Sequence, residues 1–185
     1  DILFIDEIHR LNKMVEEILY PAMESGVLDI IIGKGPSART IQLDLPPFTL
    51  IAATTRVAMV SSPLRSRFSG GVFRLEFYSN EEIEEIVKRS SNLLKIILDE
   101  EALKEIAKRS RFTPRAANYF LKRCRDFAQV HPEGKRASDG AGKKIIDKKM
   151  AMGALNLLAI DDIGLNSSDR KFLEILIEKF NGGPV

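Results

Sequence analysis

The sequence contains few of the residues that form disulfides and metal sites. Cys124 is its only cysteine, which excludes an internal disulfide and is typical of proteins in a reducing cytosol. The two histidines, His9 and His131, lie far apart along the chain, so we expect no histidine-based metal site. No apolar run approaches the ~20 residues that cross a bilayer, and no membrane-spanning helix is predicted.

Charge of either sign is not in excess. The chain has 28 Lys and Arg against 26 Asp and Glu, a net charge of +2, so composition alone gives no indication of nucleic-acid binding. Its 185 residues are enough for one domain with a core or for two smaller modules. The chain starts inside an apolar stretch, without an initiator Met or the layout of a signal peptide. We therefore expect it to be a piece of a longer protein.

The first ten residues organise the rest of the chain. Residues 2–5 are apolar and run directly into Asp6 and Glu7, as in a strand buried on both faces of a parallel sheet. Ligands of such sheets bind beyond the carboxyl ends of the strands, where two acids would hold a cation or a reacting group. A strand that ends in a solvated acidic turn would give the same pattern.

A second apolar strand, residues 48–53, ends in hydroxyl and cationic side chains. Thr54 and Thr55 could bond a phosphate or a nucleophilic water beside the acids, although threonines that simply end a strand would look the same. Arg65 and Arg67 follow a proline and precede a glycine pair, and such arginines are better anion ligands than core residues.

Periodicity predicts the remaining elements. We expect a helix over 12–23, kinked or ended by Pro21 and stopped by Gly26, then a hairpin over 28–45 and a third strand over 72–77. Helices are predicted from Ser79 with a capping box to Glu82, from Asp99, from Thr113, over 145–158 and from Ser168. Residues 131–144 and 161–164 read as a polar loop and a linker.

Several of these stretches resemble AAA+ ATPases, and in detail the RuvB family of Holliday-junction branch-migration motors. The resemblance rests on FIDEIHRLNK, IGKGPSAR, LDLPPFTLIAATTR, SSPLRSRF, LEFY, RSRFTPR and EKFNGGPV, and it covers nearly the whole chain. It implies an α/β fold: the C-terminal part of an AAA+ P-loop-type parallel sheet over 1–77, an all-α helical lid over 78–160, and the linker and first helix of a winged-helix DNA-binding domain over 161–185.

The resemblance also implies roles for individual residues. Asp6 and Glu7 would be the acid that holds Mg²⁺ through water and the acid that activates the attacking water. Thr54, or else Thr55, would be the sensor on the neighbouring strand. Arg67 would be the arginine finger that reaches a neighbouring subunit's ATP, with Arg65 competing for that role. The remaining implied contacts to the nucleotide are those of Glu24, Tyr78 and Arg115. On the hairpin, alternation sets Ile41 and Leu43 on one apolar face, which is either packed on the domain or offered to a partner.

The function implied is an ATP hydrolase and four-way-junction DNA helicase of the bacterial cytoplasm, active in recombination and DNA repair. It would work as a homo-hexamer on duplex DNA with the partner RuvA. A clamp-loader-type AAA+ ATPase and a non-hydrolysing assembly subunit are the alternatives.

The chain departs from the family pattern in one important way. It contains no G-x-x-x-x-G-K-[ST] phosphate-binding loop. In the family, the strand that leads into this loop lies between the second and third strands predicted here. The chain alone should therefore leave a gap in its sheet and be inactive as an ATPase.

Overall fold

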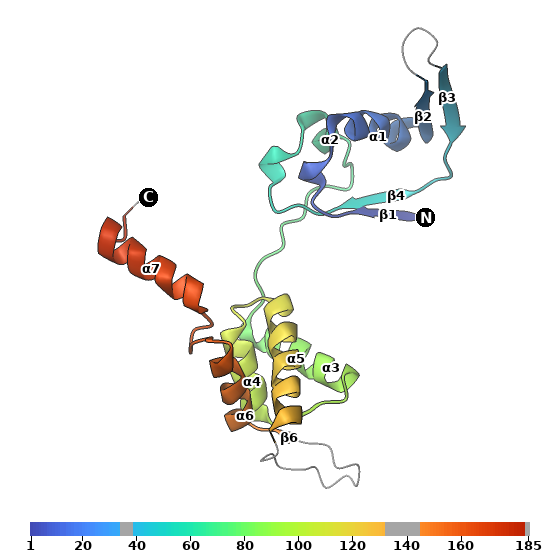
Figure 1. Ribbon diagram of the computed structural model, residues 1–185. Helices are drawn as coiled ribbons and strands as arrows, with labels where there is room; N and C mark the ends of the chain where they lie inside the picture. The colour runs from blue at the N-terminus through green and yellow to red at the C-terminus, as the bar shows by residue number, and fades with distance from the viewer. Residues whose placement is uncertain (34–38, 132–144, 184–185) are drawn as a thin grey trace. The chain divides into compact units, whose positions relative to one another are not determined.

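The computed structural model describes residues 1–33, 39–131 and 145–183, and the chain divides into two compact units, Asp1–Arg74 and Leu75–Val185. Figure 1 shows the first unit in blue to green and the second in green to red. Each unit is described by itself below. Among the helices so described, none is both long and apolar enough to cross a membrane.

Two parallel strands form the base of the first unit. β1 (Ile2–Ile5) pairs with β4 (Thr49–Ala52) in a register that sets Ile2 opposite Thr49 and Ile5 opposite Ala52. The predicted parallel pairing of the two apolar strands is confirmed. Because parallel strands end at the same edge of a sheet, the residues after Ile5 and after Ala52 emerge side by side.

The sheet is less covered than the sequence predicts. Phe4 is 60% exposed and Ile51 is 47% exposed, so the expectation of a strand buried on both faces is wrong for the part of the chain that is described. The predicted third strand over 72–77 is also wrong, since these residues form no strand and Leu75 is 91% exposed. A segment forms a strand only when a neighbouring strand bonds to it. Within the described residues, β1 and β4 pair only with each other, and residues 72–77 join neither as a strand.

α1 (Lys13–Ser25) follows the acids of β1. The Asn12 side chain caps its first turn by accepting the Met14 N–H bond at 3.0 Å, and Gly26 ends it at φ 67°, as predicted. Pro21, however, does not end the helix, which continues for four more residues. The proline removes one backbone donor, while its own carbonyl accepts the Gly26 N–H bond at the end of the helix.

The predicted hairpin is confirmed. β2 (Val27–Ile32) and β3 (Arg39–Asp44) pair antiparallel, with Leu28 opposite Leu43 and Ile30 opposite Ile41. The predicted basic tip falls on residues 34–38, which lie outside the described residues. In Figure 1 the hairpin projects beyond the end of α1.

A small apolar cluster joins the elements that carry the predicted site. Its buried members are Ile8, from the turn η1 (Ile8–Arg10), Val60, which follows η3 (Val57–Met59), and Leu64, from α2 (Ser62–Ser66). Tyr20 and Phe68 are among the partly buried residues packed against it. This packing fixes α1 and α2 beside the strand ends.

The second unit contains a bundle of four helices. These are α3 (Asn80–Leu93), α4 (Glu100–Arg109), α5 (Pro114–Val130) and α6 (Lys148–Leu157). Their shared core includes Ile83, Val87, Ile106, Leu121 and Leu155, all with no exposed surface. The predicted capping box of Ser79 and Glu82 at the start of α3 is confirmed.

Two short strands close the bundle and correct one prediction. β5 (Ile97–Leu98) and β6 (Ile145–Ile146) pair in parallel, so the helix predicted over 145–158 begins later, at Lys148. The carboxylate of Asp147 accepts the Met150 N–H bond at 2.9 Å and caps the helix there. A continuous apolar pattern cannot separate a two-residue strand from the first turn of a helix.

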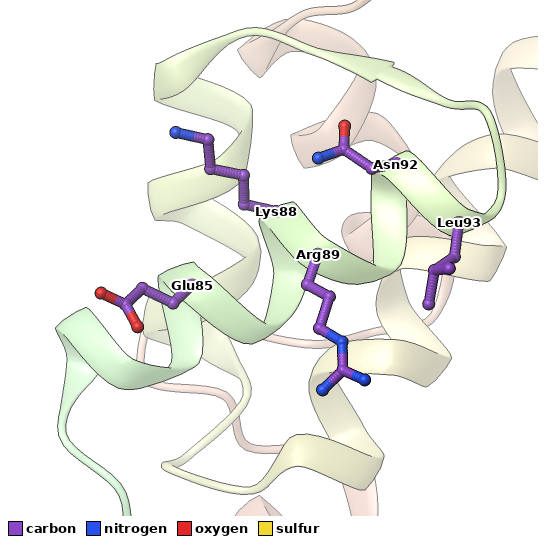
Figure 2. Close-up of a pocket in the computed structure, with 5 residues that line it drawn as sticks. All are labelled: Glu85, Lys88, Arg89, Asn92 and Leu93. Atoms are coloured by element: carbon purple, nitrogen blue, oxygen red, sulfur yellow. The ribbon is translucent and has the colours of Figure 1, made fainter.

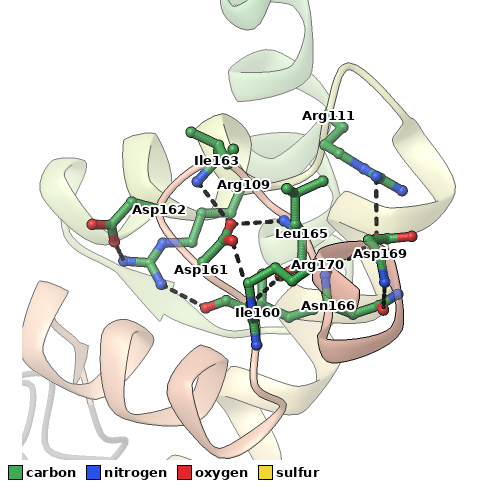
Figure 3. A network of polar contacts seen from close by, with 10 residues as sticks. All are labelled: Arg109, Arg111, Ile160, Asp161, Asp162, Ile163, Leu165, Asn166, Asp169 and Arg170. Carbon is green, nitrogen blue, oxygen red and sulfur yellow. Dashed lines mark hydrogen bonds and ion pairs between the residues drawn. The ribbon is translucent and has the colours of Figure 1, made fainter. Parts of the chain in front are cut away.

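The stretch before the last helix is tied to the bundle. The guanidinium of Arg109, which is 1% exposed, contacts Glu105 at 2.7 Å. It also contacts Asp162 at 2.7 Å and the carbonyl of Ile160 at 3.1 Å (Figure 3). Gly164 adopts φ 84°, and a Cβ there would lie 2.1 Å from the carbonyl oxygen of Arg109. The predicted linker is therefore an ordered connection.

α7 (Ser167–Phe180) begins one residue before the predicted start. Asn166 caps it, with Asp169 completing a capping box, and Arg111 reaches Asp169 at 3.3 Å. The helix ends at Asn181 in the left-handed conformation.

Candidate functional site

The two predicted acids lie in the turn directly after β1. Asp6 is exposed, and its Oδ1 accepts a hydrogen bond from the Glu7 N–H group at 2.9 Å. Glu7 has φ 50° and ψ 47°, a left-handed conformation that is uncommon for residues other than glycine. Such backbone strain is often found at functional sites, where the surrounding structure holds it in place.

The neighbouring strand holds the Glu7 carboxylate. The Thr55 hydroxyl donates to Glu7 Oε2 at 3.2 Å, and the Thr55 backbone N–H donates to the same oxygen at 3.4 Å. These bonds, the backbone one foremost, keep the pKa of Glu7 below its ordinary value. The structure therefore brings Thr55 to the carboxylate, whereas the resemblance placed Thr54 first.

His9 completes this network, and sequence reasoning missed it. Its Nδ1 lies 2.8 Å from the Thr54 hydroxyl and 3.1 Å from Glu7 Oε2, and its side chain is only 5% exposed. Thr54 in turn accepts the Arg56 backbone N–H bond at 3.0 Å. The signal that could have found His9 is its position two residues after Glu7, because one tight turn returns that side chain to the strand ends.

Arg67 lies at the C-terminal end of α2, beside α1. Its Nη2 contacts Glu24 Oε1 at 2.9 Å, its Nη1 donates to the Pro63 carbonyl at 2.8 Å, and its guanidinium carbon lies 4.2 Å from the centre of the Tyr20 ring. Arg65 lies exposed on α2. Two residues predicted to meet a nucleotide, Glu24 and Arg67, therefore meet each other within one subunit.

Comparison with known proteins gives both units the same relatives. Residues 1–75 match the family model described as the Holliday junction DNA helicase RuvB P-loop domain, and residues 78–161 match the RuvB AAA lid domain. The chain belongs to the RuvB family. The family predicted from the sequence motifs and the predicted α/β fold class, with parallel strands followed by a helical lid, are both confirmed.

Solved structures of RuvB are similar along the whole chain. The Thermotoga maritima RuvB Holliday junction branch migration motor is 43% identical, covers 100% of this chain and matches with a TM-score of 0.78. Two single-site variants of that protein give 44% identity with a TM-score of 0.78 and 43% with 0.80. This chain covers 53% or 54% of those chains, so it spans about half the length of the RuvB structures it matches.

The RuvB lid carries the other two predicted nucleotide contacts. Tyr78, 45% exposed, directly precedes the cap of α3, and Arg115 lies exposed in the first turn of α5, after the Thr113–Pro114 start. Both belong to the second unit, whereas Asp6 and Glu7 belong to the first.

The RuvB hairpin presents the predicted partner-binding side chains. Ile41 and Leu43 are each 45% exposed, and they share a face with their cross-strand neighbours Ile30 and Leu28. Ile31, 71% exposed, lies on the opposite face of the same hairpin.

No second candidate site emerges elsewhere in the described part of this RuvB chain. A shallow hollow on the lid is lined by Glu85, Lys88, Arg89, Asn92 and Leu93, all from α3 (Figure 2). These are exposed side chains of mixed charge along a single helix, with no converging polar groups. In the same described ranges, no three His, Cys, Asp or Glu side chains are grouped to hold a metal ion.

Proposed function

We propose that the protein containing this chain is an ATP-driven motor that migrates four-way Holliday junctions during recombination and DNA repair. One observation carries the proposal: an acidic pair follows β1, and a threonine from the neighbouring strand fixes the second acid, in a chain with RuvB P-loop and lid domains. The motor would act as a homo-hexamer in the bacterial cytoplasm, on duplex DNA, with RuvA as its partner.

Asp6 fits the proposed role of holding Mg²⁺ through a water molecule. One carboxylate oxygen accepts the Glu7 N–H bond while the side chain remains exposed, and oxygen ligands, often with retained waters, are what Mg²⁺ prefers. When bound, the ion would neutralise charge on the ATP phosphates. The phosphate-binding loop has no counterpart in these 185 residues.

Glu7 fits the role of orienting the attacking water. Its pKa lies below the ordinary value, so the carboxylate is ionised at neutral pH and can accept a hydrogen bond that orients the water. Thr54 and Thr55 both belong to the network around it, and the direct contact favours Thr55 as the residue that links this strand to Glu7.

The remaining proposed roles concern residues around a bound nucleotide. Arg67 would serve as the arginine finger, Tyr78 and Arg115 as lid contacts, and Glu24 as a further residue near the nucleotide. Residues 1–77, 78–160 and 161–185 would belong to the ATPase domain, the lid and the start of a winged-helix DNA-binding domain, respectively.

Complementation between two inactive full-length variants tests the proposal. Glu7 would act on its own subunit's ATP and Arg67 on a neighbour's, where a finger contributes on the order of 10³-fold or more in rate. Glu7→Gln and Arg67→Ala proteins should each be nearly inactive, and mixing them should restore measurable ATPase activity in a concentration-dependent way. Mixed rings would contain interfaces at which an intact Glu7 faces an intact Arg67.

Arg65→Ala is the matched control, because it removes the same charge two residues away. It should keep most of the activity. If native mass spectrometry shows mixed rings and no mixture recovers activity, then Arg67 acts within its own subunit or is structural, and the proposed assignment fails.

A further inference from the structure

Three groups of its own subunit hold the guanidinium of Arg67. The Glu24 carboxylate supplies charge at 2.9 Å, the Pro63 carbonyl accepts a hydrogen bond at 2.8 Å, and the Tyr20 ring lies at 4.2 Å, within the range of a cation–π contact. As a result the Arg67 side chain is only 23% exposed. Arg67, which is proposed to reach a neighbouring subunit, therefore already binds three groups of its own subunit.

The Tyr20 side of this site is fixed by a second set of bonds. The Tyr20 hydroxyl donates to Glu16 Oε2 at 3.0 Å, and the Ser61 hydroxyl donates to the same oxygen at 2.7 Å. Ser61 also caps α2, since its Oγ accepts the Leu64 N–H bond at 3.3 Å. α1 therefore contacts both ends of α2, through Glu16 at the start and through Tyr20 and Glu24 at the end.

The ion pair between Arg67 and Glu24, in contrast, is weak. The Glu24 side chain is 56% exposed, and exposed ion pairs contribute only about 0–1 kcal/mol. The Nε atom of Arg67 is buried without a hydrogen-bond partner, so the guanidinium uses only part of its donor set here. Phosphate oxygens match the arginine donors at least as well as one exposed carboxylate does.

We propose that Tyr20 and Glu24 form a holding site for Arg67, in which the Glu24 carboxylate takes the place of a neighbouring subunit's phosphate oxygens until a ring forms. Glu24 is the exchangeable anion, and Tyr20 is a positioning residue that keeps the guanidinium aligned before and after the exchange. The inference rests on the proposed function, because it takes Arg67 as the finger.

Charge removal at Glu24 in the full-length protein tests the exchange. Glu24→Gln keeps the size of the side chain and removes the competing charge, so half-maximal ATPase activity should be reached at an approximately three- to fivefold lower protein concentration, the change expected from losing an exposed ion pair. Glu17→Gln, the same change at an exposed position of α1, should leave that concentration unaltered.

Substitution of Tyr20 tests positioning. Tyr20→Leu removes the ring face and should lower kcat about tenfold while the KM for ATP changes less than twofold, and Tyr20→Phe, which keeps the ring, should restore most of kcat. A purely structural role would instead show as a lower unfolding temperature in Tyr20→Leu with no kcat difference between folded Tyr20→Leu and Tyr20→Phe, which would overturn the positioning role.

The outcomes separate the two proposals. If Glu24→Gln matches Glu17→Gln, or loses kcat as expected for a residue that binds nucleotide directly, the holding site is wrong while the proposed function stands. If Arg67→Ala rings keep normal ATPase activity, then Arg67 is not the finger and both assignments fall.

Discussion

Two consecutive residues in the second unit adopt a backbone conformation that suits neither of them. Arg111 has φ 51° and Phe112 has φ 57°, and left-handed geometry costs residues with a Cβ roughly 1–2 kcal/mol each. They connect the end of α4 to the Thr113–Pro114 start of α5. The strain therefore lies immediately before Arg115, one of the proposed nucleotide contacts.

Relief of this strain is measurable. Phe112→Gly should be more stable than Phe112→Ala by about 1 kcal/mol in the free energy of unfolding, because both variants lose the ring and only glycine accepts the positive φ freely. Urea unfolding followed by circular dichroism gives the comparison. Equal stability of the two variants would show that the left-handed conformation is not maintained in solution.

The position of the two acids after a strand could be predicted from the sequence, but the groups that surround them could not. Asp6 and Glu7 are identifiable because an apolar run ends directly on them. Which threonine meets Glu7 depends on the pairing of Ile5 with Ala52, and the approach of His9 depends on the tight turn η1. Both are properties of tertiary structure, and the pattern of residue types carries neither.

At the scale of elements, the hairpin offers the sharpest test. Ile41→Thr and Leu43→Thr in the full-length protein should each weaken RuvA binding while basal ATPase activity is unchanged. Burial of such side chains contributes about 1.5–3 kcal/mol each, so a loss of roughly tenfold or more in affinity is expected for each. Binding can be measured by titration calorimetry.

The opposite face of the hairpin provides the control. Ile31→Thr removes a similar exposed apolar surface that points the other way, and it should leave RuvA binding intact. If Ile31→Thr weakens binding equally, or if Ile41→Thr lowers the unfolding temperature and keeps the partner, the face of Ile41 and Leu43 is not the binding surface.

Elements with strong local signals were predicted correctly, whereas two short segments whose structure depends on a distant neighbour were not. The capping box of α3 and the glycine that ends α1 depend only on residues close together in the sequence. The strand predicted over 72–77 depends on a neighbour that the described chain does not provide, and β6 depends on pairing with β5. Periodicity reports which side chains are apolar and leaves open what they pack against.

At the scale of the molecule, the chain contains the two acids proposed for catalysis and no G-x-x-x-x-G-K-[ST] phosphate-binding loop. Without backbone N–H groups and a lysine to cradle the phosphates, the isolated chain should bind ATP no more tightly than the millimolar range, or about 4 kcal/mol. Titration of labelled ATP with Mg²⁺ measures this, with the full-length protein as the positive control. Micromolar binding by the chain would show that no essential part of the site is missing.

The buried Arg109 joins the end of α4 to the segment that leads into α7. Arg109 bonds Asp162 and the Ile160 carbonyl, both in the segment that leads to α7, and Glu105 of its own helix is its second charged partner. Gly164 presses so closely on the Arg109 carbonyl that even a methyl group would not fit. The segment that leads into α7 is therefore held against the C-terminal end of α4 by both sets of contacts.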